Sequence, residues 1–157
     1  MTELPQGDVR LLAHEVATKL LGSTELARVA YVAKDGTPRV LPMMFHWNGE
    51  ELVLPTFGGT AKVTALLARP DIAVTIDVQG PPPEMLMIRG RAEITESDGL
   101  LPEYRAAHLR YYGEEQGEQN VAAADQPGVR MARIAVRPAW VGVLDFQTRL
   151  PAALTRS

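Results

Sequence analysis

Residues 56–62 form the segment whose residue types and spacing could most clearly do chemistry. A strand pattern ends at Thr56, two glycines follow, and a helical pattern begins near Thr60, a residue type that favours the N-cap position. The free N–H groups and the positive dipole end of a helix start favour an anion. Glycines allow a ligand to approach the backbone closely. The chemistry predicted for this segment is therefore the binding of a phosphate, and its residues are Thr56, Gly59, Thr60 and Lys62.

Lys62 falls in the first turn of the predicted helix, where a cation is unfavourable for the helix itself. It therefore needs a negative partner, which a bound phosphate would provide. Residues 57–69 contain Lys62 and Arg69 and no acidic residue. An ordinary capped surface helix with a solvated lysine explains the same spacing, so both interpretations stay open on the segment alone.

Catalytic and metal-ligating side chains are not predicted. The chain has no cysteine, and its three histidines lack paired spacing, which disfavours a metal site. His46, at a strand end, is either a proton donor to a substrate or a partly buried turn residue. Without an acid–base or nucleophile constellation, any redox chemistry would come from a cofactor.

Length and composition indicate one globular domain, residues 1–157, with 46% hydrophobic residues. The net charge of −3 disfavours broad nucleic-acid binding, since no excess of cations is present to contact phosphates. No apolar run of about 18 residues and no signal peptide is visible, so we expect a cytoplasmic protein without a membrane span.

The hydrophobic periodicity alternates between strand and helix along the chain. We expect an antiparallel meander of three strands, joined by turns at Asp35-Gly36 and Asn48-Gly49, and then further strands with inserted helices. Residues 113–128 read as polar and irregular. The predicted strands are 26–33, 39–46, 51–56, 71–78, 85–95, 129–136 and 140–146, and the predicted helices are 9–21, 60–68 and 97–112. Six or seven short antiparallel strands with flanking helices favour a mainly β fold, a small barrel.

The pattern Thr56-x-x-x-Thr60-x-Lys62-x-x-x-Leu66-x-x-x-Pro70, followed by a strand, resembles the pyridoxamine 5′-phosphate oxidase-like superfamily of split β-barrels. The hairpin at 30–40 agrees with this resemblance, which covers about residues 20–146. It implies an FMN-binding-like split barrel at 23–146, after an N-terminal helix in 1–22 and before a tail at 147–157. It also implies a homodimer with cofactor sites between the subunits, and a phosphate of FMN or of the deazaflavin F420 held by the Thr and Ser/Thr-x-Lys turn.

The resemblance places further residues beside the cofactor ring. Pro42, Met43 and Met44 correspond to the strand under the ring, and an alternative is that the methionines alternate between core and exterior. Trp140 starts the last strand, which in this superfamily approaches the cofactor of the partner subunit; an interface or core aromatic is the other interpretation. A proline inside a strand is best tolerated at an edge or beside a ligand.

The chain departs from the oxidase proper, whose strand before the phosphate turn carries an Arg and a Lys. Those positions fall on Val40 and Phe45 here, and Arg39 is one residue out of register and thus on the other face. Oxidation of pyridoxine phosphate is therefore disfavoured. The sequence resembles the flavin- or deazaflavin-dependent oxidoreductases of the superfamily.

This resemblance implies hydride transfer between bound F420 or FMN and a small organic substrate. The alternative is a non-catalytic flavin-, F420- or haem-binding protein, for which His46 and His108 are the candidate haem ligands. The acidic tail of F420 would favour basic residues at the mouth of the groove, with Lys34, Arg39 and Arg69 as candidates. The choice between FMN and F420, and the substrate, stay open.

Overall fold

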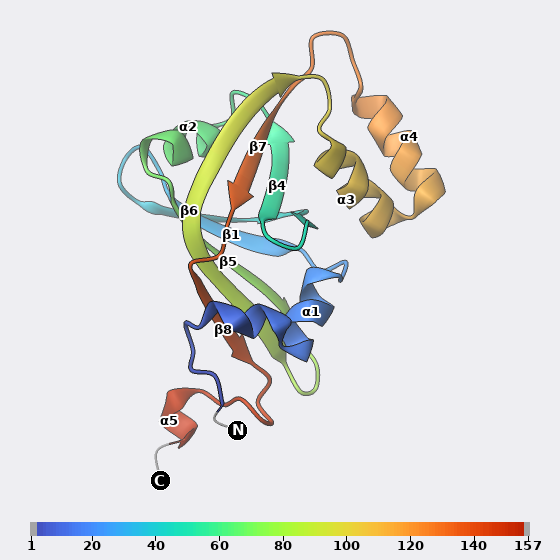
Figure 1. Cartoon of the computed structure of the whole chain (residues 1–157). Coiled ribbons are helices and arrows are strands. Elements are labelled where there is room, and N and C mark those ends of the chain that lie inside the picture. Colours follow the sequence, from blue (N-terminus) through green and yellow to red (C-terminus); the bar gives the residue numbers. More distant parts are fainter. Residues whose placement is uncertain (1–2, 156–157) are drawn as a thin grey trace.

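The computed structural model describes residues 3–155, which form one antiparallel sheet of eight strands with flanking helices (Figure 1). The strands are β1 (Ala27–Val32), β2 (Pro38–Met43), β3 (His46–Trp47), β4 (Leu52–Phe57), β5 (Asp71–Val78), β6 (Glu84–Asp98), β7 (Arg130–Val136) and β8 (Trp140–Leu144). The helices are η1 (Val9–Ala13), α1 (Glu15–Leu21), α2 (Ala61–Ala68), α3 (Pro102–Tyr112), α4 (Glu114–Ala124) and α5 (Ala152–Thr155). Among these described residues, no helix has the length and apolar character needed to cross a membrane.

The strand order is β2-β1-β5-β6-β7-β4-β3, and β8 pairs with β6 outside this path. The 15-residue strand β6 joins two half-sheets. Its residues 84–91 pair with β5, residues 85–89 also pair with β8, and residues 92–98 pair with β7. The edge strands β2 and β3 are linked through Met44 and Phe45 alone, so the two edges of the sheet return toward each other without closing. This arrangement confirms the predicted mainly β split barrel.

The core lies between the inner faces of the two half-sheets. Alternate residues of each strand enter it, as the twofold periodicity of a strand requires. Helices α1 and α2 add apolar side chains such as Leu20 and Leu66. Among the largest fully buried side chains are Phe45, Leu52, Leu54, Ile76, Leu86, Ile88 and Ile134.

The expected three-stranded meander is wrong. Strand β2 pairs with β1, but β4 pairs with β3 and with the distant β7. The predicted strand 39–46 breaks because Phe45, which is fully buried, carries the chain from one half-sheet to the other. Turn chemistry identified both hairpins, whereas the long-range pairing with β7 had no local signal.

The helices also differ from the periodicity-based expectation. The predicted helix 9–21 is interrupted at His14, whose Nδ1 accepts the N–H of Val16 (3.2 Å) and caps α1. The predicted helix 97–112 begins only at Pro102, since β6 extends to Asp98.

Residues 113–128, expected to be irregular, contain α4. This polar helix is stabilised by packing against α3 (Figure 1). Gly117 makes the contact possible, because a Cβ there would lie 2.8 Å from the carbonyl oxygen of His108. Tertiary packing of this kind is not visible in a polar sequence window.

Gly90 lies where β6 leaves β8 and joins β7, and it generates a testable prediction. A Cβ at Gly90 would lie 2.8 Å from the carbonyl oxygen of Arg137 and 3.0 Å from Cγ1 of Val136. We expect Gly90→Ala to lower the free energy of unfolding by about 1–3 kcal/mol, the usual cost of overpacking. Urea denaturation measures the change. Gly22→Ala is the control, because a Cβ there meets its nearest atom at 3.6 Å; equal stability of the two variants would contradict the close approach.

Candidate functional site

The predicted phosphate turn connects β4 to α2. Gly59 has a φ of +75°, a backbone conformation that favours glycine, and Thr60 then takes the extended N-cap conformation before α2. Val63 and Leu66 anchor α2 in the core, which fixes the position of its first turn. The side chain of Thr60 makes no capping hydrogen bond. No side-chain cap therefore accepts a hydrogen bond from the first N–H groups of α2. A bound anion could accept hydrogen bonds from them instead.

Two polar groups of this turn lack the partners that their burial demands. The hydroxyl oxygen of Thr60 is buried and has no hydrogen-bond partner among the described residues. Lys62 is partly buried, and it belongs to none of the ion pairs within residues 3–155. Burial lowers the pKa of Lys62. A donor without an acceptor beside a cation without an anion fits a phosphate group.

Thr56 on β4 and Glu96 on β6 lie near the turn, on the two strands that flank β7. Thr56, 8% exposed, is paired with Ala132, and Ala132 is paired with Glu96 on its other side, so all three side chains share the inner face. The N–H of Gly58 donates to the carbonyl of Arg130 (3.0 Å), and a Cβ on Gly58 would lie 3.3 Å from Oε1 of Glu96. Sequence reasoning missed Glu96 because the predicted strand stopped at residue 95. The alternation of Ala92 and Ile94, continued by one step, would have placed it.

The three residues predicted to lie under the ring occupy three different environments. Pro42 is exposed on the outer face of β2, which is an edge strand and tolerates the missing N–H, as expected. Met43 is opposite the buried Ala27 and packs against the core. Met44 is half-buried in the link between the two edge strands. Only Met44 thus lies in the opening of the split barrel itself.

Trp140 lies on the outer face of the sheet, in a slot. The guanidinium carbon of Arg89 stacks over its ring at 3.9 Å. Any Cβ on Gly7 or Gly142 would meet the ring at 2.7 Å, so both glycines are needed for the fit. Four strand spacings, about 19 Å, separate β8 from β2 across this face. Trp140 and Pro42 therefore do not meet within one chain.

Comparison with known proteins decides the family. The family model described as pyridoxamine 5′-phosphate oxidase matches residues 13–142. The chain belongs to this family. No curated protein matches the sequence.

Solved structures show the same family fold. An F420 reductase is 25% identical, with a TM-score of 0.58, over 78% of this chain and 93% of that one. A conserved hypothetical protein from Mycobacterium tuberculosis is 17% identical, with a TM-score of 0.70, over 96% and 94%. A haem-binding protein from Mycobacterium smegmatis is 20% identical, with a TM-score of 0.61, over 87% and 55%.

The histidines of this family member lie away from the phosphate turn. His46 is opposite Val53, about 13 Å along β4 from Phe57. Burial lowers the pKa of His46, and the charge of Arg110 lowers it further.

His108, which sequence reasoning proposed as a haem ligand, belongs to a series of stacked rings. Its ring lies 4.3 Å from that of Tyr104 and 5.5 Å from that of Tyr112, and Tyr104 in turn contacts Phe57. The residue is 8% exposed, and burial lowers its pKa. Its Nδ1 lies 3.4 Å from Nδ2 of Asn120, so little of the imidazole is accessible to a haem iron.

Two of the basic residues predicted for the groove mouth have protein partners. Arg39 pairs with Asp35 (3.0 Å), and Nη1 of Arg69 donates to the carbonyl of Ala33 (2.7 Å). Hydrogen bonds from Thr37 and Arg39 lower the pKa of Asp35 to about 2, so this pair stays charged above that pH. These two arginines are engaged in the hairpin and at the end of α2.

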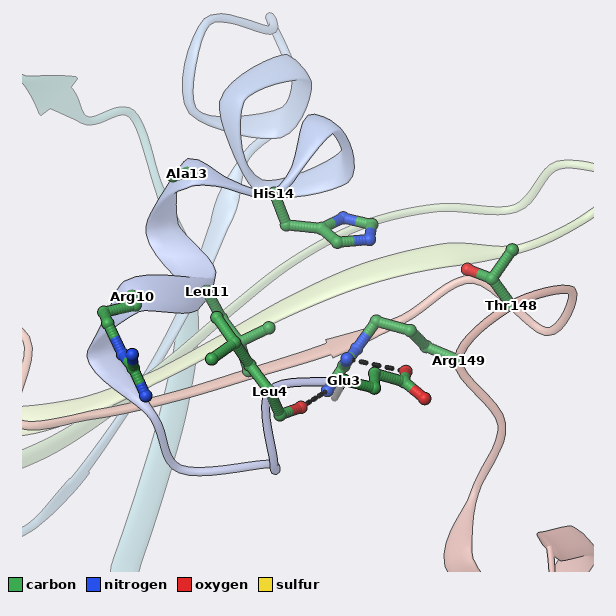
Figure 2. A pocket seen from close by; sticks show the side chains of 8 residues that line it. All are labelled: Glu3, Leu4, Arg10, Leu11, Ala13, His14, Thr148 and Arg149. Atoms are coloured by element: carbon green, nitrogen blue, oxygen red, sulfur yellow. Dashed lines mark hydrogen bonds and ion pairs between the residues drawn. The ribbon is translucent and has the colours of Figure 1, made fainter. Parts of the chain in front are cut away.

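A cavity of about 460 Å³ lies at the other end of the barrel, between the N-terminal segment and the loop after β8 (Figure 2). Arg149, whose side chain is 5% exposed, crosses it and donates to Oε1 of Glu3 (2.7 Å) and to the carbonyls of Leu4 and Val143 (2.9 and 3.1 Å). These three hydrogen bonds connect the loop after β8 to the N-terminal segment and to β8 itself. We therefore interpret the cavity as a structural junction.

The unpartnered hydroxyl of Thr60 leads to a prediction about stability. Thr60→Val keeps the side-chain shape but removes a buried polar atom, so we expect the free energy of unfolding of the ligand-free protein to rise by about 1 kcal/mol. Thr64→Val is the control, since the Thr64 hydroxyl is exposed and makes only a long bond (3.5 Å) to the Thr60 carbonyl. Thermal and urea unfolding measure both variants, and a loss of stability for Thr60→Val would show that the hydroxyl has a protein partner.

Proposed function

We propose that this protein binds FMN or F420 through its phosphate at the turn formed by residues 56–62, and uses it to transfer a hydride to or from a small organic substrate. The observation that carries the proposal is a pair of groups at the turn that have no protein partner within residues 3–155, the buried hydroxyl of Thr60 and the ammonium group of Lys62. The family assignment supports it, as does a similar solved structure that is an F420 reductase.

Each residue of the turn has a separate task in this proposal. Lys62 neutralises the phosphate, and the Thr60 hydroxyl and the free N–H groups of α2 donate hydrogen bonds to it. Gly59 supplies the backbone conformation that brings these donors together. The cofactor supplies the hydride chemistry, so the protein binds, orients and shields the ring and needs no acid–base pair of its own.

We further propose that two chains associate through the outer face of β2, β1, β5, β6 and β8. This face carries a row of exposed or half-exposed residues across five strands, Val40, Ala30, Ala73, Arg89 and Trp140. Val40 is 69% exposed, and an apolar groove of about 440 Å³ crosses the same strands beside it. A second copy is the favoured occupant, because Trp140 is too far from Pro42 to share a ring with it inside one chain. The cofactor sites would then lie between the two subunits.

A non-catalytic binding protein on the same barrel is the competing function. For haem, the burial of His108 and the contact of its Nδ1 with Asn120 argue against it as an axial ligand. The absorption spectrum of the purified protein distinguishes the cases. A flavin or deazaflavin band supports the proposal, and a Soret band contradicts it.

The first prediction of this proposal concerns Lys62. We expect Lys62→Met to raise the dissociation constant for FMN or F420 by about ten-fold or more, because a charge-assisted contact to phosphate is lost. Fluorescence titration measures the constant. Lys19→Met, which removes an equal charge from the exposed face of α1, serves as the matched control. Unchanged affinity of the Lys62 variant, with its circular dichroism also unchanged, would refute the phosphate role.

The second prediction concerns the outer sheet face. Ala73→Arg introduces a cation between Ala30 and Arg89, so we expect the dimer to dissociate, with a dissociation constant raised about a hundred-fold or more. Sedimentation velocity measures the oligomeric state. Leu67→Arg on α2, at a site 62% exposed, is the control that leaves the dimer intact. A dimer that persists in the Ala73 variant, or a monomeric wild type, would contradict this interface.

A further inference from the structure

An acidic side chain lies where an anion is proposed to bind. The carboxylate of Glu96 approaches the backbone of Gly58 so closely that a Cβ there would lie 3.3 Å from its Oε1. The register explains the approach. Glu96 and Thr56 flank the small, fully buried Ala132 on the inner face, and the Glu96 side chain is exposed at the end of this row. Glu96 is therefore a neighbour of the turn by construction of the sheet.

The other charged groups around the turn leave Glu96 without a partner of its own. Arg130, whose Cβ also borders Gly58, forms an ion pair with Asp98 (3.0 Å). Glu96 and Lys62 take part in none of the ion pairs within residues 3–155. Apart from the Arg130–Asp98 pair, the turn thus carries one positive charge, on Lys62, and one negative charge, on Glu96.

We infer that Glu96 is a specificity-determining residue, which makes the turn favour a phosphodiester over a phosphomonoester. This inference rests on the proposed function of the turn. A diester carries one negative charge, which Lys62 balances. A monoester carries nearly two charges above its second pKa of about 6. Lys62 attracts each of these charges and Glu96 repels each of them, so Glu96 penalises a monoester more than a diester.

The two candidate cofactors differ in this respect. FMN ends in a phosphomonoester, whereas the phosphate of F420 is a diester that joins the ribityl chain to the acidic tail. The charge of Glu96 therefore provides a physical reason for the site to prefer F420 over FMN, which the other residues of the turn do not provide. The ligand class that follows is a ribityl phosphodiester.

The test uses ligands that differ by one charge only. FMN is compared with its phosphate methyl ester, and the 5-deazaflavin 5′-phosphate is compared with its own methyl ester, by fluorescence titration at pH 8. For whichever ring binds, the measured quantity is the ratio of the dissociation constant of the monoester to that of the methyl ester. We expect Glu96→Gln to lower this ratio roughly five-fold, the size of effect that one screened surface charge has on a neighbouring charge.

Glu93→Gln is the matched control, because Glu93 is exposed on the same strand but points to the opposite face. A lowered ratio in the Glu96 variant, together with an unchanged ratio in the Glu93 variant, supports the inference. If wild type binds the ligands and Glu96→Gln leaves the ratio unchanged, the inference is wrong and the proposed function stands. If wild type binds neither ring, both are wrong.

Discussion

The fold depends on a single strand that is long enough to belong to two half-sheets. β6 holds β5 and β8 along its first part and β7 along its second, so the inner faces of both halves point into one core. The passage between the halves requires Gly90, where the backbone of Arg137 leaves no room for a side chain. Because β4 is attached to β7, the position of the phosphate turn relative to the rest of the barrel is also set through β6.

The same strand supplies the group that gives the turn its electrostatic character. At most protein surfaces an acid beside a helix N-terminus simply stabilises the helix. Here the acid lies beside Gly58 of a turn whose Thr60 hydroxyl has no hydrogen-bond partner among residues 3–155. Such a site is poorly satisfied by itself, which is typical of places where stability is given up for binding. At the other end of the barrel, by contrast, the guanidinium of Arg149 is bonded to the chain itself.

Local chemistry in the sequence was sufficient for much of this architecture. The Asp35-Gly36 and Asn48-Gly49 turns, the N-cap at Thr60 and the edge position of Pro42 were all predicted from residue type and spacing. The failures share a cause, since each depended on contacts between distant segments. The pairing of β4 with β7, the break at Phe45 and the packing of α4 on α3 around Gly117 have no signal within a short window. Glu96 was missed for a different reason, because the predicted strand ended one residue before it although β6 continues to Asp98.

The junction of the two ends has a consequence for how the chain folds as it is synthesised. Gln6 exchanges two hydrogen bonds with the backbone of Val143, Gly7 donates to the carbonyl of Val141, and Glu3 holds Arg149. Every partner of this early segment is made more than a hundred residues later. During translation the segment therefore stays unpaired until the ribosome has released β8, and the slot around Trp140 is among the last parts of the barrel to be completed.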